Sequence, residues 1–253
     1  MGKTFEALIK AEKQKIIDPE EIRALDLTPH PYPQPKPPVA VSFDIPPQIV
    51  EGYLKMKRTL LSTSHGKKIK TILFSSSTAG EGTSTVLFNF AITLASGGDT
   101  VLVVDANLRN PILHGLFNLE KKNGFTELVL GNRTLQEVIK GTRINNLSVI
   151  TSGTPHPNPS SLFASKSLDT LTEQMKSHAD WVLFDSPPIN SYSDSSTFAE
   201  KIDGVVMVVH AEKTRWEEAQ SAKEQIETGK VKILGTILNR RKMHIPDWAY
   251  KRL

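Results

Sequence analysis

A glycine-rich stretch at residues 75–91, SSSTAGEGTSTVLFNFA, has the residue types of a loop that binds phosphate. Gly80 and Gly82 favour a turn in which backbone N–H groups converge on an anion, and the helix expected to follow adds the positive end of its dipole. The Ser84 hydroxyl stands where such loops ligate magnesium, and Thr85 can cap the helix or contact a phosphate. The stretch therefore predicts a site for a phosphate-bearing ligand with magnesium.

The loop lacks its usual cation, because Thr83 stands where a lysine is expected. A lysine about 4 Å from a phosphate oxygen contributes up to roughly 4 kcal/mol of gross Coulomb energy at an effective dielectric near 20. We therefore expect nucleotide affinity to be lower by about one to two decades. Phosphoryl transfer should suffer more than binding, because it depends almost wholly on positioning and electrostatics. The charge could instead come from a neighbouring subunit, or from cations near in sequence: Arg109, Lys67, Lys68 and Lys70.

Two further candidate residues, Asp105 and Asp185, each end an apolar run. A single aspartate in this position often caps the next helix or stabilises a turn. Two aspartates beside a phosphate loop are the oxygen ligands that magnesium prefers, and each could hold the ion directly or through water. Asn239 ends another apolar run and adds a polar group. Together these residues predict a nucleotide–magnesium site.

A parallel sheet must position these residues. Six runs rich in Val, Ile and Leu alternate with helix-length segments, which is typical of an α/β, doubly wound, mainly parallel sheet with helices on both faces. Ligands of such sheets bind beyond the carboxyl ends of the strands, where the candidate residues fall. The strands are expected within residues 69–77, 100–111, 145–153, 180–188, 203–214 and 231–241, and the helices at 48–61, 84–96, 134–140, 161–177 and 215–229.

Composition excludes several classes of function. The 31 basic and 27 acidic residues are interspersed, so the formal net charge of +4 forms no basic block, and we expect no nucleic-acid partner. The absence of cysteine excludes disulfides and thiol chemistry, and the seven histidines lack the spacing of metal ligands. No apolar run approaches the roughly 18 residues of a membrane span, and the N-terminus has no hydrophobic signal core. We therefore expect a cytoplasmic protein without a direct membrane span.

The pattern along the chain predicts three parts. Residues 1–27 have the spacing of two short helices and form an expected N-terminal helical extension. Residues 28–46 are a proline-rich linker, since half of the 16 prolines lie between Pro29 and Pro47. Residues 47–253 form the main domain.

Five motifs in this order resemble the cytoplasmic domain of bacterial tyrosine kinases, the BY-kinases of capsule and exopolysaccharide biosynthesis: AGEGTST, VLVVDANLRNP, PHPNPSSLF, VLFDSPP and LNRR. These kinases are P-loop proteins related to the MinD/ParA group. The resemblance covers roughly residues 47–253, and the opening MGKTFEALIKAEK resembles free-standing members without a fused membrane domain. It implies a fold of the P-loop NTPase type and an ATP-dependent tyrosine kinase that uses ATP or ADP with Mg²⁺.

The resemblance also implies roles for individual residues. Asp105 matches an acid that lies close to the attacking tyrosine hydroxyl and to magnesium, Asp185 matches the Walker B acid that orients the metal, and Arg109 matches the arginine of the motif around Asp105. Asn239 matches the asparagine that reads the adenine edge, and Asp194 falls in a stretch similar to the family's TDA. The implied catalytic residues are Asp105, Asp185 and Arg109; the implied metal ligands are Ser84, Asp105 and Asp185; and the implied cofactor-binding residues are Ala79, Gly80, Glu81, Gly82, Thr83, Ser84, Thr85 and Asn239.

The chain departs from the family pattern at several positions. Besides Thr83, Asn107 replaces the second acid of an Asp-x-Asp pair, and Tyr250 stands alone where the family has a tyrosine cluster. Of an assembly motif Glu-x-x-Arg-x-x-Arg only Arg58 remains, with Gly52 and Lys55 at the other positions. These departures bear on charge stabilisation, acid chemistry, autophosphorylation and ring assembly.

Three readings follow. The first is an active autokinase with a variant loop and Tyr250 as its acceptor. The second is a nucleotide-responsive or nucleotide-free pseudokinase subunit that binds the cytoplasmic segment of a Wzz-like membrane polysaccharide co-polymerase, either alone or as a homo-oligomer. Such a protein would be peripheral at the inner membrane through that partner. The third, a MinD/ParA-type positioning ATPase, is disfavoured because the signature lysine at the start of that group's loop is absent: Ser75, Ser76 and Ser77 precede Thr78.

Overall fold

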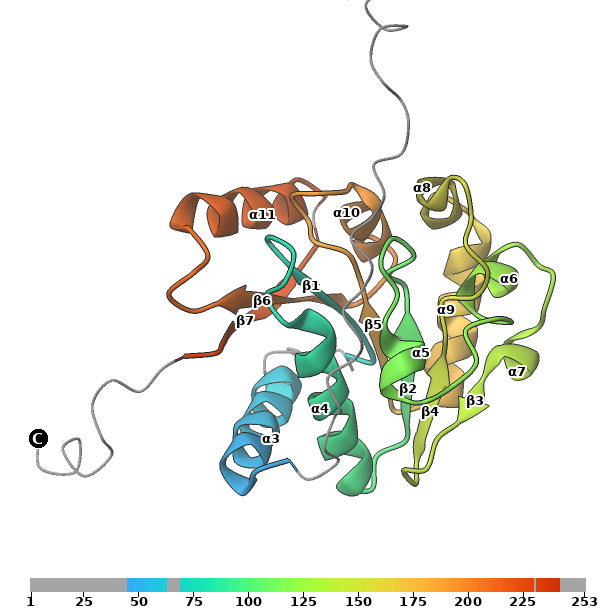
Figure 1. Cartoon of the computed structure of the whole chain (residues 1–253), viewed down its shortest axis with the longest axis horizontal. Coiled ribbons are helices and arrows are strands. Elements are labelled where there is room, and N and C mark those ends of the chain that lie inside the picture. Colours follow the sequence, from blue (N-terminus) through green and yellow to red (C-terminus); the bar gives the residue numbers. More distant parts are fainter. Residues whose placement is uncertain (1–44, 63–68, 230, 242–253) are drawn as a thin grey trace, which may run out of the picture. The chain divides into compact units, whose positions relative to one another are not determined.

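A computed structural model describes residues 45–62, 69–229 and 231–241 (Figure 1). These residues all belong to one unit, Pro38–Leu253. The expected extension at 1–27, nearly all of the linker at 28–46, Lys67, Lys68 and Tyr250 lie outside the described residues. The part of the chain that the structure describes contains no helix that is both long and apolar enough to cross a membrane.

The described strands form one sheet in the order β3-β4-β2-β5-β1-β6-β7. Every neighbouring pair is parallel except β3 with β4. Six strands confirm the predicted runs, and the two-residue β3 was not predicted. The strands are β1 (Thr71–Ser76), β2 (Val101–Asp105), β3 (Lys140–Gly141), β4 (Leu147–Ile150), β5 (Trp181–Asp185), β6 (Gly204–His210) and β7 (Ile233–Asn239).

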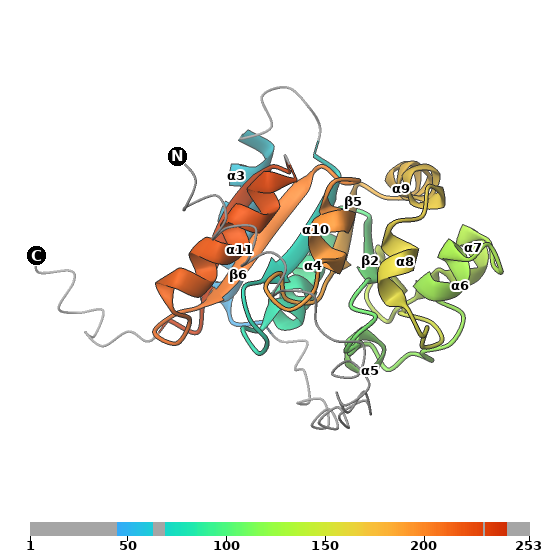
Figure 2. The ribbon, with the colours of Figure 1, turned by 90° about the horizontal axis from the view of Figure 1, so that it is seen from above.

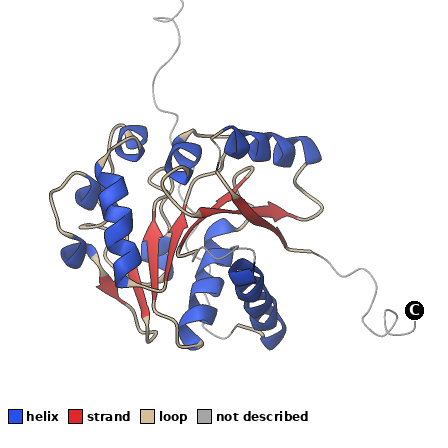
Figure 3. Ribbon diagram, turned by 180° about the vertical axis from the view of Figure 1, so that it is seen from behind, coloured by secondary structure: helices blue, strands red, loops and turns tan. Residues whose placement is uncertain are grey.

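Helices cover both faces of the sheet, as predicted (Figure 3). Alternate strand residues point to opposite faces, so Ile72 and Phe74 of β1 join one buried cluster and Leu73 joins the other. The first cluster packs against α3 (Pro47–Ser62), α4 (Thr83–Ser96) and α5 (Leu113–Leu116). The second packs against α6 (Phe125–Val129), α7 (Leu135–Val138), α8 (Pro159–Phe163), α9 (Ser167–His178), α10 (Asp194–Ala199) and α11 (Trp216–Thr228).

Two predicted helices have different limits. The helix expected at 134–140 ends at Val138 as α7, and Lys140 then pairs with β4 in an antiparallel register. The helix expected at 161–177 is divided into α8 and α9. Between them the Ser165 hydroxyl accepts a hydrogen bond from the backbone N–H of Ser167 at 3.3 Å, which competes with helical hydrogen bonding.

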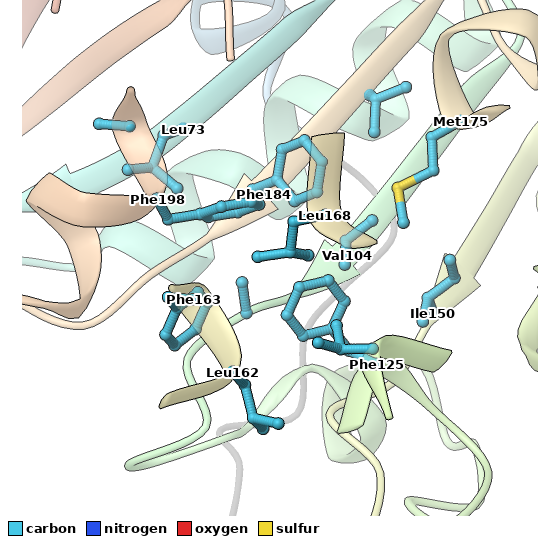
Figure 4. Close-up of a cluster of buried hydrophobic side chains, with 14 of the residues drawn as sticks. Leu73, Val104, Phe125, Ile150, Leu162, Phe163, Leu168, Met175, Phe184 and Phe198 are labelled. Carbon is cyan, nitrogen blue, oxygen red and sulfur yellow. The ribbon is translucent and has the colours of Figure 1, made fainter. Parts of the chain in front are cut away.

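Four phenylalanine side chains hold the short helices against the sheet (Figure 4). The Phe198 ring of α10 lies 4.9 Å from Phe184 of β5 and 5.4 Å from Phe163 of α8, measured between centroids. Phe125 of α6 lies 6.0 Å from Phe198. On the same face, α10 and α11 lie side by side (Figure 2). This packing fixes the segments that follow the carboxyl ends of β2 and β5.

Candidate functional site

The loop between β1 and α4 has the backbone expected of a phosphate cradle. Gly80 and Gly82 have φ angles of 84° and 90°, a left-handed conformation that favours glycine. A Cβ atom on Gly82 would also lie 2.3 Å from the Asn239 side-chain nitrogen, so a larger residue would displace Asn239. Helix α4 begins at Thr83 directly after this turn, and its N-terminal N–H groups face the same side as the loop. The predicted anion-binding geometry is therefore present in the backbone.

The Glu81 side chain holds this loop from inside. Only 2% of Glu81 is exposed, and its carboxylate accepts hydrogen bonds from the backbone N–H groups of Ser77 at 2.8 Å and Thr78 at 3.1 Å. It also accepts hydrogen bonds from the hydroxyls of Ser77 and of Thr214 in the turn after β6. The resemblance implied only a cofactor-binding role for Glu81, so this bracing role was missed. It ties the loop to the turn between β6 and α11.

The sheet brings the two predicted aspartates together. Asp105 and Asp185 are fully buried and lie opposite each other in the register of β2 and β5. The Ser84 hydroxyl donates to Oδ2 of Asp185 at 2.6 Å, and the backbone N–H of Leu113 donates to Oδ2 of Asp105 at 3.1 Å. Oδ1 of each aspartate has no hydrogen-bond partner among the described residues. Two buried carboxylate oxygens beside the phosphate loop can therefore bind a cation or a proton.

The environment of this pair favours a proton when no cation is bound. Burial raises the pKa of Asp185 to about 7, although hydrogen bonds from Ser84 and the backbone of Ser186 lower it. Burial and the negative charge of Asp185 raise the pKa of Asp105 well above its usual range, although the N–H of Leu113 and the charge of Lys121 oppose this. Two carboxyl groups this close titrate as a pair. The pair is therefore suited to exchange a proton for a divalent cation near neutral pH.

The donor set fits Mg²⁺. Magnesium commonly takes one or two protein carboxylates and completes its shell with water and phosphate oxygens. Ser84, Asp105 and Asp185 supply such a partial set. The described residues contain no cluster of three or more His, Cys, Asp or Glu side chains suited to a metal, so a magnesium ion here would take its remaining ligands from water and phosphate. The geometry suits a metal that arrives with a nucleotide.

Arg109, the third implied catalytic residue, is engaged with α8 and α10. Its guanidinium donates to Asp194 and to the hydroxyl of Ser160, both at 2.9 Å, and lies 4.6 Å from the centre of the Tyr192 ring. The Ser160 hydroxyl also donates to Asp194 at 2.6 Å. In this arrangement Arg109 braces the loop after β2 against the two helices.

Asn239 and Asn107 each stabilise a turn. Nδ2 of Asn239 donates to the backbone oxygen of Glu81 at 2.8 Å, so the residue implied to read adenine holds the phosphate loop here. Oδ1 of Asn107 accepts the backbone N–H of Asn110 at 3.1 Å in the segment after β2.

One suggested substitute for the loop lysine is wrong. The Lys70 ammonium donates to the backbone oxygens of Lys176 and Ala179, at the end of β1 opposite the phosphate loop. Two other cations, Lys213 and Arg215, line a cavity together with the loop and were not among the predicted substitutes. Their position follows from β6 lying next to β1, so only a correct strand order could have revealed it.

Known proteins share this fold and its motifs. A family model described as an AAA domain matches residues 69–230. The putative tyrosine-protein kinase CapB of Staphylococcus aureus is 32% identical over 76% of this chain and 84% of its own length. The tyrosine-protein kinase YwqD of Bacillus subtilis is 35% identical over 76% of this chain and 81% of its own length.

A solved structure supports the same relationship. The chimerical protein CapA2B2 superposes with a TM-score of 0.73 and 33% identity, covering 76% of this chain and 85% of that one. The range matched by the family model, residues 69–230, includes the phosphate loop and both aspartate-bearing strands. The chain therefore belongs to the bacterial tyrosine kinase (BY-kinase) family of P-loop proteins.

Proposed function

We propose that this chain binds ATP or ADP with Mg²⁺ at the phosphate loop and acts in capsule or exopolysaccharide production as a tyrosine-kinase-like protein with weakened phosphoryl transfer. The observation that supports this most directly is the 2.6 Å hydrogen bond between Ser84 and Asp185 beside a second buried aspartate, Asp105. It joins the loop to the acid pair in one site.

Each part of the site has a task in this proposal. The loop N–H groups and the N-terminus of α4 hold the phosphates. Ser84 and Asp185 hold the metal, which when bound neutralises charge that develops on the transferred phosphoryl group. Asp105 would share the metal and orient an acceptor hydroxyl, and it can take the proton of that hydroxyl once the bound cation has displaced its own proton.

Two substitutions reduce the electrostatic support for transfer. Thr83 offers a hydroxyl where a charged ammonium would contact phosphate oxygens. Asn107 can accept a hydrogen bond but can neither take a proton nor offer full negative charge to a cation. Binding depends largely on backbone groups that remain, so it is retained more readily than turnover.

The same two substitutions favour a second candidate function, a regulatory pseudokinase subunit. In this reading the chain binds the cytoplasmic segment of a membrane polysaccharide co-polymerase and is held at the membrane by that partner. Residues 1–38 are the proposed contact, so their deletion should abolish co-purification with membranes. Intact recruitment of the deletion variant would overturn that contact assignment.

Thermal unfolding tests the nucleotide site. Ligand that binds only the folded state raises the melting temperature, so Mg·ADP should stabilise the chain and magnesium-free ADP should do so less. Ser84→Ala should remove most of the magnesium-dependent rise in melting temperature, because it deletes the hydroxyl next to Asp185. Ser177→Ala is a matched control, since the Ser177 hydroxyl donates to the backbone oxygen of Glu173 on the exposed side of α9. Equal shifts in both variants would contradict the proposed metal site.

A further inference from the structure

A small cavity lies against the phosphate loop. Its volume is about 260 Å³, and its walls come from loop residues 78–81, from the turn between β6 and α11, and from Glu218 in the first turn of α11, whose carboxylate accepts the backbone N–H of Arg215 at 3.2 Å. The turn contributes two cationic side chains, Lys213 and Arg215, together with His210. The cavity therefore places two cationic side chains and one carboxylate, that of Glu218, next to backbone that is built to bind an anion.

Both cationic side chains are available to bind a ligand. Among the described residues, the Lys213 ammonium and the Arg215 guanidinium have no hydrogen-bond or ion-pair partner, and both side chains are exposed. Arg109, by contrast, is bound to Asp194. Long flexible side chains of this kind can reach toward a ligand at little structural cost.

The turn that carries them is fixed to the loop. Thr214, the residue between the two cations, donates its hydroxyl hydrogen to Glu81, and the backbone N–H of His210 donates to Thr214 at 3.2 Å. Glu81 in turn binds the backbone of Ser77 and Thr78. The Cα positions of Lys213 and Arg215 are thus set relative to the phosphate loop.

The charges around the loop create a need for such cations. The carboxylate of Glu81 is buried inside the loop, and Asp105 and Asp185 lie beside it. A nucleotide polyphosphate adds further negative charge, which one Mg²⁺ only partly offsets. With Thr83 in place of lysine, the loop itself supplies no cationic side chain.

We propose that Lys213 and Arg215 contact the phosphates of the bound nucleotide and supply the positive charge that Thr83 cannot. This inference rests on the proposed nucleotide-binding function. It predicts a preference for ligands with more phosphate charge, so ATP should depend on the two residues more strongly than ADP does.

Calorimetric titration of the full chain with Mg·ATP and Mg·ADP tests the proposal. Lys213→Ala and Arg215→Ala should each weaken Mg·ATP binding about three- to tenfold, as expected for loss of an exposed charged contact. The double variant should weaken it further, with a smaller loss for Mg·ADP. Lys223→Ala is the matched control, because Lys223 lies on α11, the helix that follows this turn, but does not line this cavity. Unchanged melting temperatures of the magnesium- and nucleotide-free variants verify folding.

A double-mutant cycle makes the test specific. If the two cations replace the loop lysine, Thr83→Lys should restore affinity to the Lys213→Ala Arg215→Ala variant, and the effects should be non-additive. If the wild-type chain binds Mg·ATP and neither Lys213→Ala nor Arg215→Ala weakens that binding, this inference is overturned while the nucleotide site stands. Absence of Mg·ATP binding by the wild-type chain would overturn the nucleotide site and this inference together.

Discussion

Thr83 is the residue at which this phosphate loop lacks the lysine that such loops usually carry. It is the first residue of α4 and only 8% exposed, so a side chain there lies against the loop backbone. In the Lys213→Ala Arg215→Ala background, Thr83→Lys should tighten Mg·ATP binding by about one to two decades, because it returns a charge worth up to roughly 4 kcal/mol before desolvation. Calorimetric titration measures this.

Ser96→Lys is the control for that substitution. It adds the same charge at the exposed opposite end of α4 and should leave affinity nearly unchanged. If Thr83→Lys behaves like Ser96→Lys, the loop does not hold the nucleotide phosphates.

The acid pair predicts an unusual pH dependence at the residue scale. The folded-state pKa of Asp185 is raised to about 7, so between roughly pH 4 and that value the folded protein binds more protons than the unfolded chain. The stability of the magnesium-free protein should therefore fall as pH rises through this window. Asp185→Asn should flatten the dependence and raise the melting temperature above neutral pH, as measured by thermal unfolding across pH.

Magnesium should reverse that loss. Binding of the ion with nucleotide near or below neutral pH should release protons, which calorimetry in buffers of different ionisation enthalpy detects. Asp169→Asn, an exposed substitution of the same kind on α9, is the comparison. A wild-type profile that matches that of Asp185→Asn would contradict the described environment of the pair.

At the scale of elements, Glu81 couples the phosphate loop to the β6–α11 turn. Glu81→Gln removes the negative charge and replaces one of the two accepting oxygens with an NH2 group that cannot accept a hydrogen bond, so local opening of the loop should become easier by about 1–3 kcal/mol. Hydrogen exchange at the backbone amides of Ser77 and Thr78 should accelerate about ten- to a hundredfold. Glu137→Gln, in the capping box of α7, should leave these two amides unaffected, because its partner is the N–H of Thr134.

The contact between β7 and the loop gives a second test at this scale. Asn239→Ala removes the hydrogen bond to the Glu81 backbone oxygen. Because this bond stabilises the loop, the substitution should weaken the binding of both ATP and inorganic tripolyphosphate by several-fold. Competition binding with both ligands measures this. Weaker ATP binding with unchanged tripolyphosphate binding would instead mean that Asn239 contacts the adenine base and does not stabilise the phosphate loop.

For the whole molecule, the sheet was predictable because it is buried on both faces. Runs such as VLVVD and WVLFD carry nearly continuous apolar side chains, which only strands covered by helices require. The short helices α6 and α10 escaped prediction because their stability comes from tertiary packing of Phe125 and Phe198 rather than from local periodicity.

The candidate site was predictable to the same extent. Asp105, Asp185 and Ser84 could be placed together because parallel strands end at one edge, and the register confirms that placement. The buried role of Glu81 and the position of Lys213 depend on which strands are neighbours, and a list of strands in chain order does not contain that information. Side-chain direction within the loop is equally absent from residue spacing.

The most direct test of the account is a calorimetric titration of the wild-type full chain with ATP and ADP, with and without Mg²⁺. The loop backbone and the acid pair predict micromolar binding that requires magnesium, with one nucleotide per chain. No detectable heat of binding at millimolar nucleotide, in the presence of magnesium and with the chain shown to be folded, would contradict the central claim.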